Sequence, residues 1–446
     1  MANEAPVFGG TLRCRIILMA LTHSQRKRLA GVILLVALAI TCVVRGVVPA
    51  VTRVDTDFPN YFTAAKIVAD GGSAERLYDD SWFQEQMRRY RIGKPEEGKF
   101  SPFPPPTALL LVPLARFEPL AALRVMTGVS LLCLLCSIIL LARILAWSYV
   151  ESAVFVLLSG YAVFNALRLG QPYILVALSC ILGYYARLRG APLLAGLCFG
   201  LFTPIKYFPG VMLIYFAFRR EWKVVLGGAV AVLAVVALSI GALGWKVHEI
   251  FLSSALGNHL IGNLSLQDPF SASFQSFDAL FRRLFVLDAA SNPRPWLAVP
   301  GLQMLGVAIT KVVIFATAIA TLIRIATGSL QEKVAPSVGI LGILTLLLAP
   351  ATATYHFVLL WLPVGLLIDH FCRARAPVHA GLLLVLYTLI GFFPYGRAAY
   401  QFEGRGGLTV FAFPRLFLLL AMFVVCVSFV WSRTRPSAVA ADIAVS

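Results

Sequence analysis

Apolar stretches of about 20 residues recur along this chain, and they limit its fold more than any other feature. The first covers residues 29–48, and others follow as far as residue 431. A helix of this length matches the hydrocarbon core of a bilayer, about 30 Å thick. Hydrophobic residues make up 59% of the 446 residues, charged residues only 13%, and the mean hydropathy is +0.83. We therefore expect an all-α polytopic membrane protein.

The net charge of +17 comes largely from Lys and Arg residues at the ends of these stretches. A nucleic-acid-binding protein would gather them into a continuous patch, whereas short basic clusters between apolar segments are typical of cytoplasmic loops. Placing the clusters inside predicts about twelve transmembrane helices, an uncleaved first helix, and cytoplasmic N and C termini. The predicted spans are residues 29–48, 119–146, 151–167, 172–186, 191–203, 207–218, 224–243, 302–325, 337–349, 357–371, 378–393 and 410–431.

These spans predict two membrane modules. We expect a cytoplasmic tail (1–28), a seven-helix module (29–243) with an outer loop (49–118), a second outer loop (244–300), a five-helix module (301–431) and a cytoplasmic tail (432–446). Residues 107–117 are apolar but short and follow prolines, so we interpret them as a re-entrant or surface helix outside the membrane. If they cross instead, the two half-length segments around Pro204 must form one span.

The first outer loop is the acidic part of a basic protein. Nine of the 21 acidic residues lie between Asp55 and Glu97. Apolar residues at helical spacing around Ala64 and around Phe83 indicate two amphipathic helices on the membrane surface. Asp55 and Asp57 directly follow the first span. They are either solvated loop charges or groups that act on a lipid-borne substrate.

No residue pattern indicates a metal or a cofactor. The six histidines are scattered, and no His or Cys pair at ligand spacing accompanies a third ligand. Cys133 and Cys136 have the spacing of a redox motif, but they lie inside an apolar stretch, where packing is the better interpretation. We therefore expect no metal and no cofactor.

Five short polar segments meet on the outer side under this topology. They supply a carboxylate, cations, a histidine, amides and aromatic rings, which suits chemistry on an anionic lipid. Each has an ordinary explanation as well: Lys206 can snorkel, His356 can end a helix, and Arg168 can flank a span. Lys206 and His356 lie deep in apolar sequence, where an unpaired charge is costly, and this favours a function. The segments are residues 55–61, 165–173, 203–207, 275–283 and 352–356.

Several short motifs follow one another in a fixed order between about residues 53 and 366. They are Thr56-Asp57-Phe58 with Tyr61 and Ala64-Ala65, then Phe103-Pro104-Pro105, Leu169-Gly170-Gln171, Ile205-Lys206 and Tyr355-His356. In this order and placement the chain resembles glycosyltransferase family 87, whose members are membrane enzymes of the C-type glycosyltransferase fold that use polyprenyl-phosphate sugars. The resemblance implies a common module of seven helices and an outer loop that roofs a cavity. The chain departs from the family pattern at Phe103, where a Tyr before a Pro pair is more common, and at Pro172, where an Asn is common.

The resemblance also implies that an acidic residue at the start of the first outer loop is the general base. The matching position is Asp57, with Asp55 as second choice. The donor has no diphosphate to chelate a divalent ion, so cationic side chains can stabilise the leaving phosphate. We assign this donor-phosphate role to Lys206 and His356, with Arg168 as a helper. The side chains expected to orient the sugar or the acceptor are Tyr61, Gln171 and Tyr173.

The expected reaction is a single inverting displacement on the outer face of the plasma (inner) membrane. It moves a sugar from the polyprenyl-phosphate donor to a hydroxyl of a lipid-linked or envelope glycan. Mannose is the favoured sugar because mannosyl transfer is the commonest activity that the resemblance implies, with arabinofuranose second. Two other functions stay open: a lipid-sugar flippase or other transporter, and an envelope polysaccharide polymerase or ligase. Many transporters have internal repeats, and none is visible here; Arg282-Arg283 is the one hint of a polymerase-type arginine loop.

Overall fold

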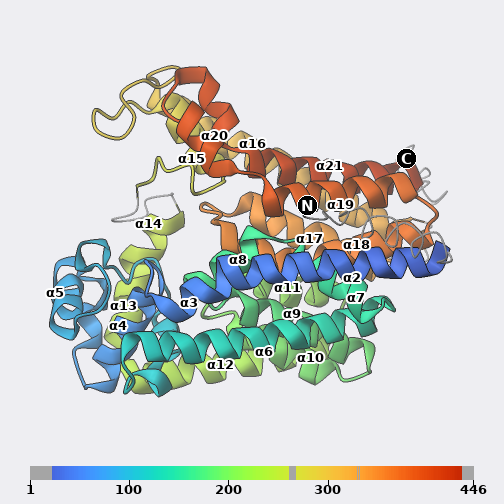
Figure 1. The fold of residues 1–446 in the computed structure, drawn as a ribbon. Coiled ribbons are helices and arrows are strands. Elements are labelled where there is room, and N and C mark those ends of the chain that lie inside the picture. Colours follow the sequence, from blue (N-terminus) through green and yellow to red (C-terminus); the bar gives the residue numbers. More distant parts are fainter. Residues whose placement is uncertain (1–22, 261–267, 329, 331, 434–446) are drawn as a thin grey trace, which may run out of the picture.

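The computed structural model describes residues 23–260, 268–328, 330 and 332–433, and these form a helical bundle (Figure 1). Within this range the only pairing of extended backbone is an isolated bridge between Asp288 and Asn292. The expectation of an all-α protein is therefore confirmed for the described residues. Most of the two predicted tails lies outside them.

Six helical segments are long and apolar enough to cross a membrane, and two bent helix pairs raise the number to eight if each pair is one span. The twelve spans and the sides of the termini thus stay predictions. The lower number arises because several apolar stretches fold as short or broken helices. The six segments are Arg28–Thr52, Pro119–Leu145, Trp222–Leu243, Pro300–Thr327, Thr354–Arg373 and Pro414–Arg433.

The first half of the bundle starts with one long rod, in which α2 continues through a π-helical turn, η1, into α3. Long helices α6 and α12 lie along the bundle (Figure 1), and the shorter α9 and α10 pack between them. The elements are α2 (His23–Cys42), η1 (Val43–Val47), α3 (Val48–Thr52), α6 (Pro119–Leu145), α7 (Tyr149–Leu157), α8 (Tyr161–Arg168), α9 (Tyr173–Leu188), α10 (Pro192–Phe202), α11 (Gly210–Phe218) and α12 (Trp222–Leu243).

A sharp bend separates α7 from α8, where the sequence predicted one straight span. The two helices form an angle of 75°. Gly160 lies at the break with φ +52°, and a Cβ there would lie 2.6 Å from the carbonyl oxygen of Gly391. Only glycine combines this backbone conformation with such a close approach. The bend redirects α8, so that Gly170, just beyond its end, packs against Phe58 of the first outer loop.

Helices α10 and α11 have 11 and 9 residues, which at 1.5 Å per residue gives about 16 and 14 Å. Neither is long enough by itself for a bilayer core of about 30 Å. Residues 203–209 connect them in a turn that contains Lys206. The pair is therefore a hairpin whose turn ends inside the protein, against the first outer loop.

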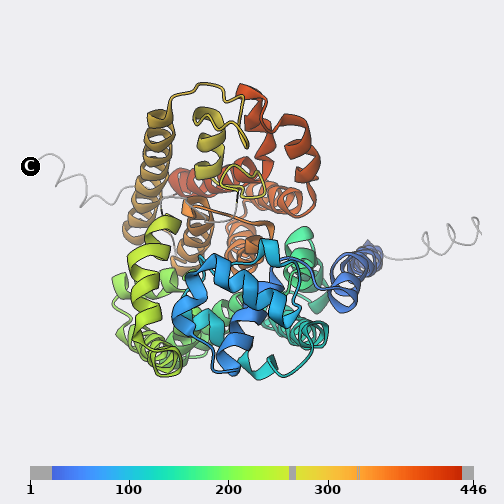
Figure 2. The same cartoon turned by 90° about the vertical axis from the view of Figure 1, so that its left-hand side faces the viewer.

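The first outer loop folds over one end of the bundle, called the loop end below (Figures 1 and 2). Its two helices agree with the two amphipathic helices expected there, and Phe58, Phe62, Phe83 and Met87 on them are buried. Residues 107–117 form short 3₁₀ turns in place of one helix. The loop contains α4 (Phe58–Ala69), α5 (Asp80–Tyr90) and the 3₁₀ turns η2 (Ala74–Tyr78), η3 (Pro95–Glu97), η4 (Pro105–Leu109) and η5 (Val112–Leu114).

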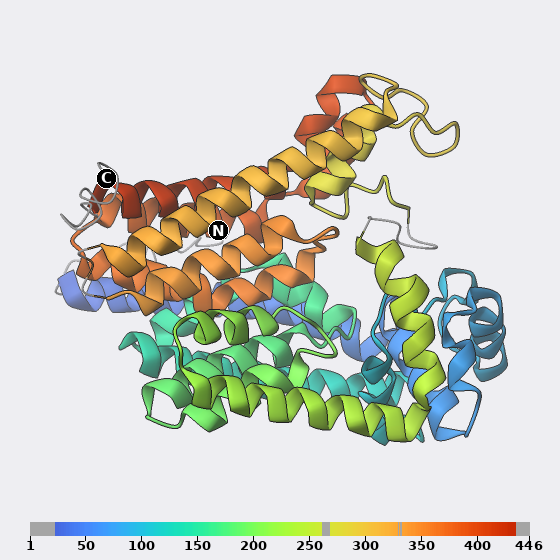
Figure 3. The same cartoon turned by 180° about the vertical axis from the view of Figure 1, so that it is seen from behind.

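The second outer loop also lies at the loop end. Its amphipathic helix α15 is held by Arg283, whose Nη2 lies 2.6 Å from the Glu403 carboxylate. Arg283 therefore joins α15 to the segment after α20 (Tyr395–Phe402). Figure 3 shows α16 (Pro300–Thr327) leading from these elements along the back of the bundle. The elements are α13 (Trp245–Ile250), η6 (Phe251–Ala255), α14 (Leu256–Leu260) and α15 (Phe277–Phe285).

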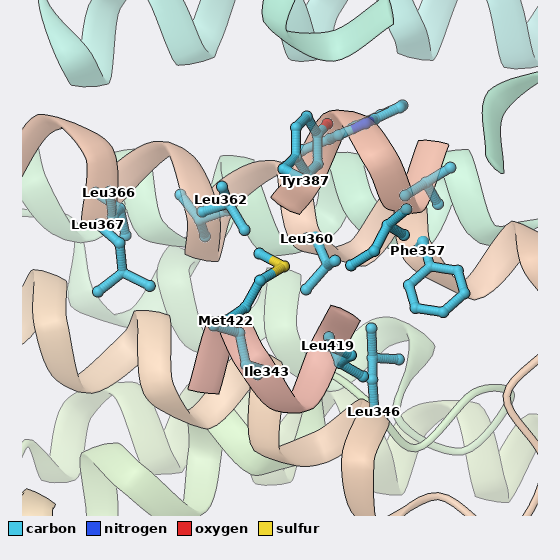
Figure 4. Close-up of a cluster of buried hydrophobic side chains, with 14 of the residues drawn as sticks. Ile343, Leu346, Phe357, Leu360, Leu362, Leu366, Leu367, Tyr387, Leu419 and Met422 are labelled. Carbon is cyan, nitrogen blue, oxygen red and sulfur yellow. The ribbon is translucent and has the colours of Figure 1, made fainter. Parts of the chain in front are cut away.

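The second half of the bundle packs around a dense apolar core (Figure 4). Ile343, Leu360, Tyr387, Leu419 and Met422, from four different elements, are almost completely buried there. In lipid such packing stabilises a bundle through van der Waals contact, because lipid tails are as apolar as these side chains. The elements are α16 (Pro300–Thr327), α17 (Val334–Leu348), η7 (Thr354–Leu360), α18 (Trp361–Arg373), α19 (Pro377–Phe392), α20 (Tyr395–Phe402), η8 (Gly406–Ala412) and α21 (Pro414–Arg433).

Candidate active site

A cavity at the loop end joins segments that are far apart in the sequence. Its walls come from the first outer loop, the start of α9, the turn between α10 and α11, and the segment that leads into η7. Among the side chains that line it are Asp57, Lys99, Tyr173, Lys206, Tyr355 and His356. The structure thus brings together residues from four of the five polar segments that the topology placed on one side, and Phe274 borders the fifth.

Asp57 directs its carboxylate away from the helix that it precedes. It occupies the N-cap position of α4, yet its side chain makes no cap hydrogen bond. An aspartate at this position commonly accepts a bond from a backbone N–H of the first turn. Here its Oδ2 accepts a hydrogen bond from Nε2 of Gln171, at 2.7 Å. The carboxylate is therefore available to the cavity.

A chain of hydrogen bonds connects Asp57 with Lys206. Nζ of Lys206 donates to Oη of Tyr61 at 3.0 Å, and that hydroxyl donates to Oε1 of Gln171 at 2.9 Å. The Gln171 amide completes the chain to Asp57. Tyr61 follows Asp57 by four residues and so lies on the same side of α4. These hydrogen bonds hold together three segments that are distant in the sequence: the start of α4, the residues before α9 and the turn between α10 and α11.

Lys206 is a buried cation, with 7% of its surface exposed. None of the ion pairs in the described part of the chain involves it. Its ammonium instead lies over aromatic rings, 4.4 Å from the centroid of Phe103, 5.2 Å from that of Tyr173 and 5.3 Å from that of Tyr61. Cation–π contacts offset part of the cost of burying the charge. The ammonium therefore lines the cavity without a carboxylate ion-pair partner among the described residues.

Burial acts on the ionisation of both groups. It raises the pKa of the Asp57 carboxyl, while the hydrogen bond from Gln171 and the charge of Lys206 oppose this shift. Burial lowers the pKa of Lys206 in the α10–α11 turn to about 7, and the Asp57 charge opposes it. A carboxyl whose pKa moves up towards neutrality is suited to act as a general base.

His356 and two tyrosines form the opposite wall. Nδ1 of His356 accepts a hydrogen bond from the Ala353 backbone N–H at 3.1 Å, which fixes the ring at the start of η7. The Tyr173 ring lies 4.5 Å from the His356 ring and 5.3 Å from the Tyr355 ring, between centroids. Tyr355 also hydrogen-bonds to the Asp57 side chain. The wall therefore connects the 349–356 segment to the carboxylate.

Two of the predicted site residues lie beside the cavity and pair with each other. Oδ2 of Asp55 is 3.0 Å from Nε of Arg168 and 4.0 Å from Nε of Arg53. Neither Asp55 nor Arg168 is among the residues that line the cavity. The pair connects the chain just before α4 to the end of α8. This placement separates Asp55 from Asp57, the other carboxylate considered as base.

Lys99 lines the cavity and was not a candidate from the sequence. Its backbone N–H donates to Oδ1 of Asn60 at 3.1 Å, which holds it above the first turn of α4. Its charge is one of the factors that lower the pKa of Asp57. In the sequence Lys99 is one of nine Lys and Arg residues in the first outer loop. Its position just before the proline run of residues 102–106 was the available signal.

Gly170 places Gln171 and provides a test of this geometry. Its φ is +60°, and a Cβ would lie 2.7 Å from Cδ2 of Phe58. We expect Gly170→Ala to destabilise the fold by about 2–4 kcal/mol, from left-handed strain and overpacking together. Thermal unfolding in detergent measures this effect. Gly190→Ala is a matched control, since its φ is +75° but nothing lies within 4 Å of the added Cβ; equal losses in both variants would contradict the packing part.

The comparison with protein families decides which class of protein this is. The model of glycosyltransferase family 87 matches residues 102–350, more than half of the chain. The chain belongs to glycosyltransferase family 87. It is therefore a membrane glycosyltransferase, as its motifs indicated. The matched range of this family 87 glycosyltransferase contains Gln171 and Lys206, whereas Asp57 and His356 lie outside it.

A comparison with curated proteins finds no match for this family 87 glycosyltransferase. Within the described residues, no group of three or more His, Cys, Asp or Glu side chains is arranged to hold a metal ion. Its cavity instead presents a carboxylate, two ammonium groups and an imidazole.

Proposed function

We propose that this enzyme transfers a sugar, with mannose favoured, from a polyprenyl-phosphate donor to a hydroxyl of a lipid-linked or envelope glycan acceptor. The reaction is a single inverting displacement on the outer face of the plasma membrane. The observation that carries the proposal is the cavity in which the uncapped carboxylate of Asp57 faces the buried ammonium of Lys206. One group can remove a proton, and the other can receive a leaving phosphate.

In this mechanism Asp57 is the general base. The acceptor oxygen attacks the anomeric carbon and its proton passes to the carboxylate as the new C–O bond forms. The bond between the anomeric carbon and the phosphate oxygen breaks at the same time, and the lipid phosphate leaves with the electron pair. General-base catalysis of this kind contributes about 10²–10⁴-fold. One displacement converts a β-linked donor into an α-linked product.

Lys206 and His356 stabilise the charge that develops on the leaving phosphate. Preorganised cations in a site shielded from water are most effective there, because little solvent reorganises during the reaction. The Tyr61 hydroxyl and the rings of Tyr61, Phe103 and Tyr173 hold the Lys206 ammonium in position before the donor binds. Arg168 has only a helping role in stabilising the leaving phosphate, because its guanidinium lies outside the cavity lining and is paired with Asp55. Tyr61, Gln171 and Tyr173 orient sugar or acceptor hydroxyls, and Gln171 also orients the base.

The two alternative functions have less support. Arg283, one of the two arginines that suggested a polymerase, lies in an internal ion pair with Glu403. A transporter has its essential charges near the middle of the membrane, with access from both sides. Here the charged groups line a cavity at the end of the bundle that carries the first outer loop, and this position does not favour a transporter.

A donor-cleavage assay tests the proposed function. Purified protein in lipid nanodiscs is incubated with a polyprenyl-phosphate sugar and a panel of glycolipid acceptors, and free polyprenyl phosphate and glycosylated product are measured. We expect both to accumulate in equal amounts with polyprenyl-phosphate mannose and neither with a nucleotide-diphosphate mannose. Transport of the intact donor across the bilayer without cleavage would contradict the proposal.

The ionisation of the two groups predicts a pH profile with an acid limb and an alkaline limb. The rate falls at low pH, below the raised pKa of Asp57, because the base becomes protonated, and it falls above about pH 7 because Lys206 loses its proton. These limits belong to the interacting pair. Lys206→Arg should remove the alkaline limb, because a guanidinium stays protonated. The measurement is kcat/KM against pH; a Lys206→Arg profile that keeps the alkaline limb would contradict the assignment.

A further inference from the structure

A second cavity lies at the end of the bundle opposite to Asp57. Its volume is about 540 Å³. It is bounded by the last residues of α6, α9, α18 and α21 and by the start of α17. It therefore lies between the two halves of the bundle. Apolar side chains of Ile144, Leu188, Leu366 and Phe429 line it together with charged groups. Nothing in the proposed transfer reaction uses it.

The charged groups of this cavity are two carboxylates and two guanidinium groups, and both carboxylates are engaged within the protein. Asp369 is paired with Arg373 at 2.9 Å. The Glu332 carboxylate accepts hydrogen bonds from the backbone N–H groups of Val334 and Ala335 at the start of α17. Arg433, on the rim, takes part in none of the ion pairs of the described residues. The carboxylates are therefore occupied while a guanidinium is available.

A smaller hollow continues this cavity and supplies an excess of positive charge. The two share Ile144 and Leu188 in their walls, and the hollow adds Arg143 and Arg189. Together they present four arginines and two carboxylates. The excess of arginines over carboxylates favours a ligand with an anionic head. The apolar walls favour a ligand that also has an apolar part.

His370 supplies an independent sign of a ligand. It lines the cavity and is 8% exposed, yet its Nε2 is buried without a hydrogen-bond partner. A buried polar atom without a partner costs about 1–3 kcal/mol. Its ring is packed against Phe429, at 5.6 Å between centroids, so it has little freedom to turn elsewhere. An anionic oxygen in the cavity would satisfy Nε2 when the imidazole carries a proton there.

We propose that this cavity binds the phosphodiester headgroup of an anionic phospholipid in the leaflet opposite to the active site. Basic pockets between membrane helices at the headgroup level are a known way to hold anionic lipids. Arg433 and the hollow's Arg143 and Arg189 contact the phosphate, His370 donates to one of its oxygens, and the acyl chains leave along the apolar walls. The lipid then ties α6 and α9 to α18 and α21.

Lipid retention and thermal stability test the site. The purified full chain in detergent is mixed with phosphatidylglycerol or with phosphatidylcholine, and bound lipid is counted by native mass spectrometry while the melting temperature is measured. We expect phosphatidylglycerol to be retained and to raise the melting temperature, and phosphatidylcholine to do neither. The triple variant Arg143→Gln, Arg189→Gln, Arg433→Gln should lose at least tenfold in apparent affinity for phosphatidylglycerol.

Two further variants keep the test decisive. Lys223→Gln removes one exposed positive charge at the start of α12, outside both hollows, and should bind phosphatidylglycerol like the parent protein. His370→Ala should weaken phosphatidylglycerol retention, and His370→Gln, which keeps a donor, should restore part of it. Equal retention by the parent and the triple variant overturns the proposal. So does stabilisation by inorganic phosphate equal to that by the lipid, because the site would then bind phosphate without a lipid.

Discussion

Replacing Asp57 by asparagine is expected to abolish sugar transfer, with a loss of about 10²–10⁴-fold or more, and to leave donor binding nearly intact. Asparagine keeps the shape of the side chain and can still accept the hydrogen bond from Gln171, so the cavity should retain its geometry. It cannot take a proton from the acceptor hydroxyl. The measurement is the single-turnover rate with saturating donor and acceptor, beside the equilibrium affinity for the donor.

Two other aspartates provide controls for this variant. Asp70 ends α4 and pairs with Lys66 at 3.3 Å on the surface, so Asp70→Asn should change transfer little. Asp55→Asn breaks the ion pair with Arg168 but leaves the cavity carboxylate in place, and should lower the rate much less than Asp57→Asn. Full activity of Asp57→Asn would remove the assignment of the base. A larger loss in Asp55→Asn would move the base to that residue.

Lys206→Met is expected to reduce transfer by about 10²–10³-fold, since it removes the cation proposed to receive the leaving phosphate. The same change should leave thermal stability unchanged or raise it. Lys206 is buried over aromatic rings without a carboxylate partner, and a methionine of similar length avoids the cost of a buried charge. Activity and melting temperature, measured on one preparation, distinguish this outcome from misfolding.

Tyr61→Phe is the matched control for the lysine variant. It removes the hydroxyl between Lys206 and Gln171 but keeps the ring and both charges. The hydroxyl accepts one hydrogen bond from the Lys206 ammonium and donates one to Gln171, but both charges stay in the cavity, so the loss of activity should be smaller than in Lys206→Met. A Lys206→Met enzyme that is as active as Tyr61→Phe would show that the ammonium does not stabilise the leaving group.

The sequence indicated which residues form the cavity, because the positions of the basic clusters assign five polar segments to the same side of the membrane. Asp57, Tyr61, Gln171 and Lys206 were all expected near one another, and their side chains form one hydrogen-bonded chain. Hydropathy averages a window of residues, so it did not indicate that α7 and α8 are bent. The segments around Pro204 were already half-length in the sequence, but each was expected to cross the membrane, and α10 and α11 are too short for that. The bend depends on one backbone conformation at Gly160 and on its approach to Gly391, and neither is encoded in hydropathy.

The pairing of Asp55 with Arg168 also escaped the sequence. Both residues were grouped with the site because they share its side of the membrane, but proximity at the level of 3 Å depends on where α8 ends after its bend. Lys99 was missed for the opposite reason. It lies in a loop whose charges resemble an ordinary solvated surface, and it reaches the cavity through its contact with Asn60.

The stereochemistry of a single turnover distinguishes direct displacement, with Asp57 as the base, from other mechanisms. The purified enzyme receives a β-linked polyprenyl-phosphate mannose and a glycolipid acceptor, and the anomeric configuration of the product is read by nuclear magnetic resonance while free polyprenyl phosphate is counted. We expect an α-linked product, one polyprenyl phosphate released per product formed, and no product from Asp57→Asn. A β-linked product, or α-linked product formed at the parental rate by Asp57→Asn, would contradict direct displacement with Asp57 as the base.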